Sequence, residues 1–216
     1  RSGLSTMLER TPLERYYMHG NVEFARKSLS AEAQAVLQDT LKHATKRTAK
    51  RAIKRTTELG DDGVLRFVEQ PPTMTHVEPG SFGPGASRAE LFAQYRETVP
   101  LDIDTVLAQY KPTDLARRVV GVGSVGTQCF LQLLQGADGA ALLLQVKEAG
   151  ESVLARYGGM VPRDRLDQGI ALHGEGFRVV NLQRISQAVS DPFLGHLQRG
   201  DRDFYVRQFH DMKGSV

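Results

Sequence analysis

The chain has 216 residues and a mass of 23.9 kDa, which suits one generous domain or a domain with a helical extension. Hydrophobic residues make up 40% of it, so it can bury a core and is not wholly disordered. Its single cysteine, Cys129, excludes an internal disulfide framework and favours a reducing compartment, so we expect a cytoplasmic protein. No window approaches the roughly 18 uncharged apolar residues of a membrane-spanning helix, so we expect no membrane partner.

The net charge of +3 hides an uneven distribution. Residues 42–55 (KHATKRTAKRAIKR) hold seven of the 28 Lys and Arg residues and no acid. A helix with this charge could follow the phosphates of a nucleic acid, but the segment contains no aromatic side chain for stacking on bases. We interpret it as a solvated or docked helix face and do not expect nucleic-acid binding.

The first half of the chain has a mostly helical pattern. Apolar and small residues recur at helical spacing from Ser30 to about Glu58, and the turn Gly60–Gly63 ends that helix. A short strand is expected over 64–68 and an irregular Pro/Gly linker over 70–87. One or two helices interrupted by Pro100 are expected over 88–110.

The second half mixes strands and helices. Strands are expected over 117–121, 141–147 and 203–209, and helices over 148–157 and 177–189. Residues 127–135 precede a turn at Gly136–Gly139 and fit either a helix or a strand. We therefore divide the chain into a mostly helical region, 1–112, and a region of mixed α and β structure, 113–216. The first residue is Arg1 rather than methionine, and we expect the chain to be part of a longer protein.

The sharpest local signal is VGVGSVG, residues 120–126, a G-x-G-x-x-G motif that follows a strand. Its glycines allow the backbone to approach phosphate oxygens closely. In a Rossmann interpretation, residues 124–135 form a helix, and Glu148 stands near the position of a ribose-binding acid. In a kinase-like interpretation, residues 127–135 are a strand that returns from the loop, and Lys147 ends the next strand, where it contacts phosphates. Spacing alone leaves both open.

Four long stretches resemble one bacterial family in the same order. They are RRVVGVGSVGTQCFLQLLQG, LLLQVKEAGESVLARYGG, FRVVNLQRISQAVSDPFLG and RDFYVRQFHDMKGS, and the upstream ARKSL and QPPTMTHV also fit. The family is the one called domain of unknown function 2252, which is uncharacterised. It is similar to the protein-kinase-like and aminoglycoside-phosphotransferase-like fold. The resemblance implies an α+β fold with a kinase-like small lobe: an antiparallel sheet with a glycine-rich loop beside the helical N-terminal region.

By that resemblance, Gly121, Gly123, Ser124 and Gly126 cover the phosphates of ATP, and Lys147 contacts them. The implied reaction is transfer of the γ-phosphoryl group of ATP, with Mg²⁺, to an acceptor that the sequence does not identify. Catalytic and metal-binding motifs of the family lie in a part of the protein outside these residues. We therefore expect this chain alone to bind nucleotide without transferring phosphate, and its partner to include the rest of its own protein. An inactive kinase-like scaffold stays an alternative.

Other side chains fit catalysis less well. A kinase lysine is usually paired with a glutamate of the following helix, but the helix expected over 177–189 has Asn181 at that position, and Glu148 would point to the opposite face from Lys147. Asp211 resembles a kinase catalytic aspartate, yet it follows a strand and lacks the expected asparagine after it. The histidines show no metal-ligand spacing, so we assign no metal site and no catalytic residue.

Overall fold

The structure is a computed structural model that describes residues 49–77, 87–119, 126–159, 164–187 and 190–209. Its helices and strands follow one another in this order: α5 (Ala49–Thr56), β1 (Thr57–Leu59), β2 (Leu65–Phe67), β3 (Met74–His76), α6 (Arg88–Arg96), α7 (Leu101–Leu107), β4 (Tyr110–Arg118), β5 (Cys129–Gly136), β6 (Ala141–Ala149), α8 (Val153–Tyr157), α9 (Asp164–Ser186), β7 (Gly195–Arg199) and β8 (Arg202–Gln208).

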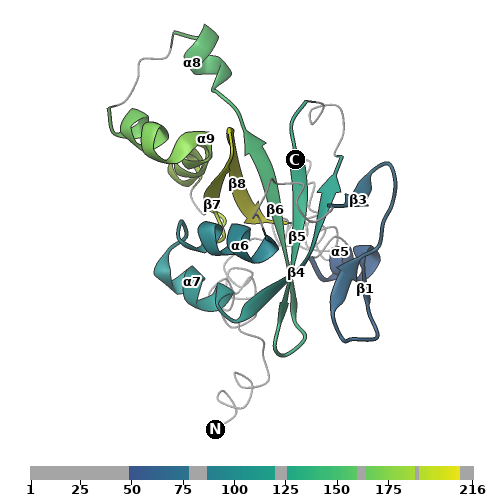
Figure 1. The fold of residues 1–216 in the computed structure, drawn as a ribbon. Helices are drawn as coiled ribbons and strands as arrows, with labels where there is room; N and C mark the ends of the chain where they lie inside the picture. Colours follow the sequence, from purple (N-terminus) through teal and green to yellow (C-terminus); the bar gives the residue numbers. More distant parts are fainter. Residues whose placement is uncertain (1–48, 78–86, 120–125, 160–163, 188–189, 210–216) are drawn as a thin grey trace, which may run out of the picture.

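A six-stranded antiparallel sheet forms the centre of the molecule (Figure 1). Its strand order is β3-β4-β5-β6-β8-β7, and β1 and β2 form a separate hairpin. Strands β4, β5 and β6 make a meander in which each strand pairs with the next. After the two helices that follow β6, the chain returns as the β7–β8 hairpin, and β8 pairs with β6.

The β5–β6 hairpin excludes one of the two interpretations of the glycine motif. Residues Cys129–Gly136 are a strand, paired antiparallel with Ala141–Ala149 across a short turn. Gly139 adopts φ +76° in that turn, and the backbone N–H of Gly136 donates to the carbonyl of Ala140. The expected antiparallel pair is confirmed. The Rossmann interpretation is wrong, because it requires a helix and a parallel crossover where the structure has a hairpin.

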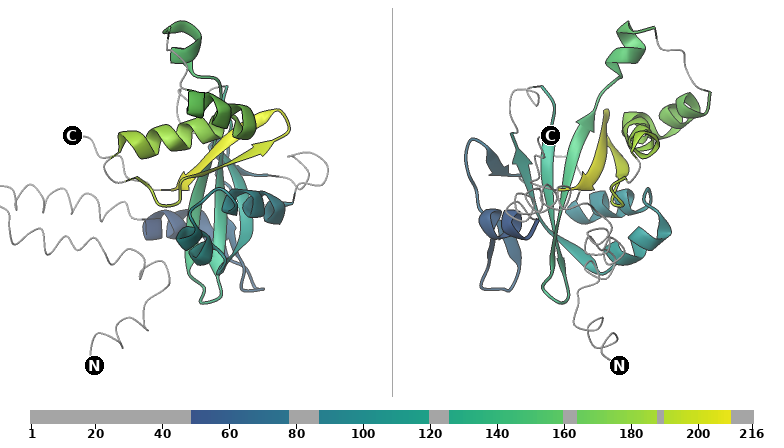
Figure 2. Two further views of the ribbon diagram at one scale, coloured as in Figure 1. Left: turned by 90° about the vertical axis from the view of Figure 1, so that its left-hand side faces the viewer. Right: turned by 180° about the vertical axis from the view of Figure 1, so that it is seen from behind.

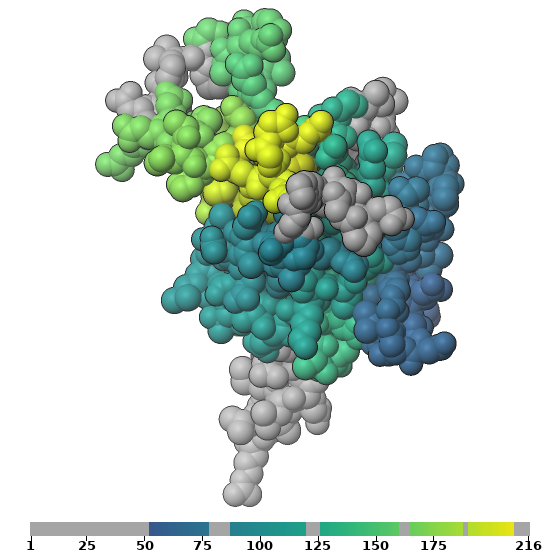
Figure 3. All heavy atoms as spheres, in the orientation of Figure 1, coloured from purple at the N-terminus to yellow at the C-terminus, as the bar shows by residue number. Residues whose placement is uncertain are grey.

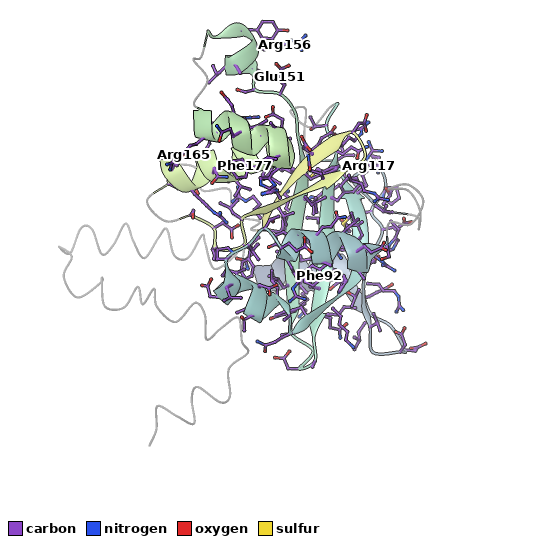
Figure 4. The ribbon with its side chains drawn as sticks, turned by 60° about the vertical axis from the view of Figure 1, so that its left-hand side comes forward. Phe92, Arg117, Glu151, Arg156, Arg165 and Phe177 are labelled. Atoms are coloured by element: carbon purple, nitrogen blue, oxygen red, sulfur yellow. The ribbon has the colours of Figure 1, made fainter. Side chains whose placement is uncertain are left out.

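The two faces of the sheet bury different clusters. Leucine, phenylalanine and valine side chains of β4–β8 that point to one face pack against α6 and α7, with Phe92, Tyr95, Ile103 and Leu107 (Figure 4). The opposite face is covered near the meander by α5 and the β1–β2 hairpin, through Ala52 and Phe67. We call this second face the Lys147 face, after the lysine that β6 places on it.

Helix α9 covers the other part of the Lys147 face. It lies against β7 and β8 in both views of Figure 2. Gly174 interrupts the helix with φ +75°, and the carboxylate of Asp203 accepts the backbone N–H of Glu175 at 2.7 Å. Asp203 therefore caps the second half of α9, whose N–H groups would otherwise lack acceptors. Phe177 packs edge-on against His196 of β7, with ring centroids 5.7 Å apart (Figure 4).

Several element boundaries agree with the sequence and several do not. The helices expected on either side of Pro100 are confirmed as α6 and α7, and a capping box between Ser87 and Glu90 starts α6. The strand expected over 117–121 begins much earlier, at Tyr110, and the helix expected over 148–157 is only α8. Strand β3 lies in the expected linker. The helix expected upstream of residue 49 falls outside the described residues.

The regions 1–112 and 113–216 predicted from the sequence share contacts in the fold. The core cluster on α6 and α7 contains residues from both sides of position 112, and β3 pairs with β4. The division of the chain at that position stays a prediction. Among the described residues, no helix combines the length and apolar character needed to cross a membrane.

Helix α8 stands away from the sheet at one end of the molecule (Figure 3). Val153, Leu154 and Tyr157 are 65–74% exposed there. Figure 4 labels Glu151 and Arg156 beside this helix, and their charged groups lie 3.8 Å apart.

Asp114 joins four elements of the fold although it is 95% buried, with 5% of its surface exposed. It lies on β4 just after an irregularity in the pairing with β5. Its carboxylate accepts the backbone N–H groups of Phe67 in β2 and Leu115 in β4, each at 2.8 Å. It also contacts Arg88 of α6 at 3.1 Å and Nδ1 of His76 in β3 at 3.2 Å. Burial of this charge is tolerable because so many donors surround it.

Replacing Asp114 with alanine should lower the free energy of unfolding by roughly 3 kcal/mol, because two buried N–H groups and a guanidinium lose their acceptor. Asp114→Asn should lose less, since its amide oxygen still accepts one N–H. Urea unfolding followed by circular dichroism measures both. Glu58→Ala, at an exposed position of β1, is the control and should change little. Equal stability of Asp114→Ala and the control would contradict this role.

His196 should make the stability fall in mild acid. Burial, the neighbouring His173 and Arg184 lower its pKa to about 4, against the opposing effect of Asp203. The unfolded chain therefore binds a proton near pH 6.5 that the folded chain takes up only near pH 4. Stability from this residue is complete above pH 6.5 and is lost as the pH falls through that window. In His196→Gln the slope of unfolding free energy between pH 6.5 and 4 should flatten, and an unchanged slope would contradict the assignment.

Candidate functional site

The structure describes only two of the residues expected to bind phosphate, Gly126 and Lys147. Gly121, Gly123 and Ser124 lie outside the described residues, so their role stays a prediction. Gly126, the last glycine of the motif, is exposed and has φ +93°, a conformation that L side chains rarely adopt. Lys147 is half-buried near the end of β6. Both residues lie at the end of the sheet where β4 ends and β5 begins.

A row of four polar side chains crosses the sheet at this end. Cys129 of β5 pairs with Lys147 of β6, Lys147 pairs with Tyr205 of β8, and Tyr205 pairs with His196 of β7. Directly opposite residues of antiparallel strands share a face. All four side chains therefore lie on the Lys147 face, between the apolar cluster under α5 and the helix α9.

Arg118 extends this row onto β4. It pairs with Met74, whose side chain belongs to the apolar cluster of the Lys147 face, so Arg118 points to that face as well. Its guanidinium carbon lies 4.7 Å from the centroid of the Phe209 ring. Cys129 thus lies on the strand between two cations, Arg118 and Lys147.

The two neighbouring cations affect the pKa of the Cys129 thiol. Burial raises the pKa of its thiol, while the positive charges of Lys147 and Arg118 and a weak hydrogen bond from Gln145 oppose that rise. Burial also raises the pKa of the nearby Tyr205. Both groups are therefore neutral near pH 7, so neither adds a negative charge beside Lys147 and Arg118.

Glu148 lies on the opposite face, as expected from its place next to Lys147. Its carboxylate accepts the backbone N–H of Gln128 at 2.8 Å and lies 3.0 Å from a guanidinium nitrogen of Arg202. Its own backbone N–H donates to the carbonyl of Gln128 at 2.9 Å. Glu148 therefore holds the chain directly after the glycine motif. The role of a ribose-binding acid is wrong for it, because that role belongs to the Rossmann fold.

Helix α9 begins before the residues that the sequence indicated, and it does contain a glutamate. Glu175 forms an ion pair with Arg178, which also donates to the carbonyl of Gly150 at 2.9 Å. The amide of Asn181 donates to the carbonyl of Phe177 in its own helix. The helix therefore reaches a glutamate upstream of its expected start, and this glutamate is already paired with an arginine.

Sequence reasoning did not identify Arg118, Tyr205 or His196 as neighbours of Lys147. Alternation within a strand predicts which residues share a face with each other, but only the pairing register says which residues of two strands are opposite. Arg118 could have been found from its place directly before the loop. Asp211 lies outside the described residues, and its role stays open.

A comparison with known families finds one match. The chain matches, over residues 1–216, the family described as an uncharacterized protein conserved in bacteria, DUF2252. No curated protein and no solved structure matches it. Because the match covers the whole chain, the protein belongs to this bacterial family.

Proposed function

We propose that this chain is the ATP-binding part of a kinase-like phosphotransferase that transfers the γ-phosphoryl group to an acceptor still to be identified. One observation carries the proposal. The lysine lies on the third strand of an antiparallel meander whose first two strands, β4 and β5, are joined through a G-x-G-x-x-G motif. Protein kinases likewise place a glycine-rich loop over the phosphates and a lysine on the third strand of the small lobe.

The connection after the lysine supports the same interpretation. Helices α8 and α9 follow β6, and the chain then returns as a hairpin whose second strand pairs with the lysine strand. Through Phe177, helix α9 packs on the Lys147 face, where a kinase helix would lie beside its lysine. The helix, the lysine and the end of the loop thus come from the same three parts of the chain as in a kinase small lobe.

The charges at the site suit phosphate. Lys147 and Arg118 lie on one face, and no carboxylate of the described residues forms an ion pair with either. A half-buried ammonium group without a counter-ion favours an anionic ligand, because the anion restores part of the lost hydration energy. Lysine binds phosphate as a compact point charge.

Bound Mg²⁺ would neutralise charge on the phosphates in this reaction. Among the described residues, no three His, Cys, Asp or Glu side chains are grouped so that they could hold a metal ion. The proposal therefore assigns no Mg²⁺ ligand to the described part of the chain. What these residues contribute is the position of the nucleotide and the positive charge beside its phosphates.

Replacing Lys147 with alanine should weaken ATP binding by on the order of 1.5–3 kcal/mol, the usual value of a charge-assisted contact. Lys147→Arg should restore only part of the ATP affinity, because a planar guanidinium group does not replace a compact ammonium group. Isothermal titration of ATP into the full chain measures both variants. Lys111→Ala, an exposed lysine at the far end of β4, is the matched control and should bind ATP normally.

Glu148→Gln tests whether ATP binding depends on Lys147 specifically or on any change of charge near the glycine motif. Its amide oxygen can still accept the N–H of Gln128, and its side chain points away from Lys147, so ATP affinity should change less than about threefold. ATP binding that is insensitive to Lys147 would overturn the proposal. NAD binding sensitive to Glu148 would do the same.

A further inference from the structure

We propose that Arg118 and Lys147 together bind two adjacent phosphoryl groups, the diphosphate part of a nucleoside di- or triphosphate, above the Cys129 side chain. This inference rests on the proposed function but goes further, because it names a second cation that no kinase motif contains. It also predicts that the site distinguishes a diphosphate from a monophosphate.

Three neighbouring strands place the two cations on either side of Cys129. Arg118, Cys129 and Lys147 lie on β4, β5 and β6, and all three side chains point to the same face. Neighbouring strands are about 4.8 Å apart, so the two cationic residues start roughly 10 Å from each other. Two long side chains at that separation can converge on an extended anion between them without folding back on the sheet.

Arg118 and Lys147 have no anionic partner among the described residues, whereas two nearby arginines do. At this end of the sheet, Arg202 pairs with Glu148 and Arg178 pairs with Glu175. Arg118 instead stacks on the Phe209 ring, which holds its planar group without neutralising it. On the Lys147 face at this end of the sheet, the positive charge without a carboxylate partner among the described residues therefore lies on the two residues that flank Cys129.

Between the two cations lies the buried side chain of Cys129. Cys129 is 3% exposed, and burial keeps its thiol neutral against the pull of Lys147 and Arg118. A thiolate there would have neutralised one of the two cations. A neutral thiol leaves both charges for a ligand and adds no repulsion toward an anion above it.

The arrangement also explains why both groups are needed. A terminal or single phosphate can satisfy Lys147 alone, whereas a neighbouring phosphoryl group gives the fork of Arg118 two further oxygens to bind. Nucleoside diphosphates, nucleoside triphosphates and inorganic pyrophosphate share this chemistry, and the experiment below distinguishes them.

The test uses the single cysteine as a reporter. The full chain, labelled with ¹³C at the cysteine β-carbon, has one such resonance, that of Cys129. ADP, ATP, AMP and pyrophosphate are titrated separately, and the shift of this resonance gives each dissociation constant. ADP and ATP should shift it and bind at least tenfold more tightly than AMP. Pyrophosphate should compete with ADP, and binding of pyrophosphate equal to that of ADP would identify the inorganic ion as the ligand.

Arg118→Gln should weaken ADP about tenfold or more and AMP less than about twofold, the loss expected for one charge-assisted contact. Arg118→Lys keeps the charge without the fork and should recover part of the affinity. The control is Arg117→Gln, because Arg117 is the exposed neighbour whose pairing with Phe130 places it on the opposite face. Thermal unfolding checks that each variant is folded.

Two outcomes would overturn the inference in different ways. ADP binding that depends on Lys147 but not on Arg118 would remove the second cation and leave the proposed function intact. No binding of any nucleotide would remove both, whereas nucleotide binding that leaves the Cys129 resonance unmoved would remove this inference alone.

Discussion

The pairing register between β5 and β6 is the constraint on which the site depends. Side chains alternate between the two faces along a strand, so a slip of one residue would move Lys147 from the face of α9 to the face of α6. Two features oppose such a slip. The tight turn at Gly136–Gly139 sets the pairing at one end, and the double contact of Glu148 with Gln128 sets it at the other. Between them, buried leucines of both strands fill both clusters, so a slipped register would exchange their partners.

The Lys147 face changes from apolar to polar along the strands, and the candidate site lies in its polar part. Under α5 and the β1–β2 hairpin it buries Leu131, Leu133 and Leu143. Toward the loop it carries Cys129 and Lys147 instead. The apolar part is covered by α5 and β2, and the buried carboxylate of Asp114 holds β2 to the sheet. The polar part begins where this cover ends and continues toward His196 under α9.

Local signals in the sequence were enough for the parts of this fold that depend on neighbouring residues. The short glycine-containing turn Gly136–Gly139 favours the β5–β6 hairpin over a helical crossover, and Pro100 separates the two helices α6 and α7 as expected. Parts that depend on distant residues were missed. Strand β3 lies in a proline-rich segment and is a strand because it pairs with β4. Strand β7 has no strong β pattern and is a strand because β8 pairs with it.

The candidate site follows the same division. The place of Lys147 near the end of a strand was predictable, because an apolar run that ends in a lysine is a local pattern. Arg118 was not, because its relation to Lys147 exists only through two strand pairings. The glutamate of α9 was missed for another reason. Gly174 made the helix look as if it began later, and the Asp203 carboxylate that restarts it comes from β8, nearly thirty residues further along the chain.

The pairing of Glu175 with Arg178 has a consequence for the charge of the whole site. A free glutamate on α9 would face the same side of the sheet as Lys147 and could neutralise it. Arg178 instead engages Glu175 and ties it, through the carbonyl of Gly150, to the end of β6. With that carboxylate paired and the thiol of Cys129 kept neutral by burial, neither group neutralises Lys147 or Arg118. This charge favours an anionic ligand, and in the proposed site phosphate oxygens would match both the planar guanidinium of Arg118 and the compact ammonium of Lys147.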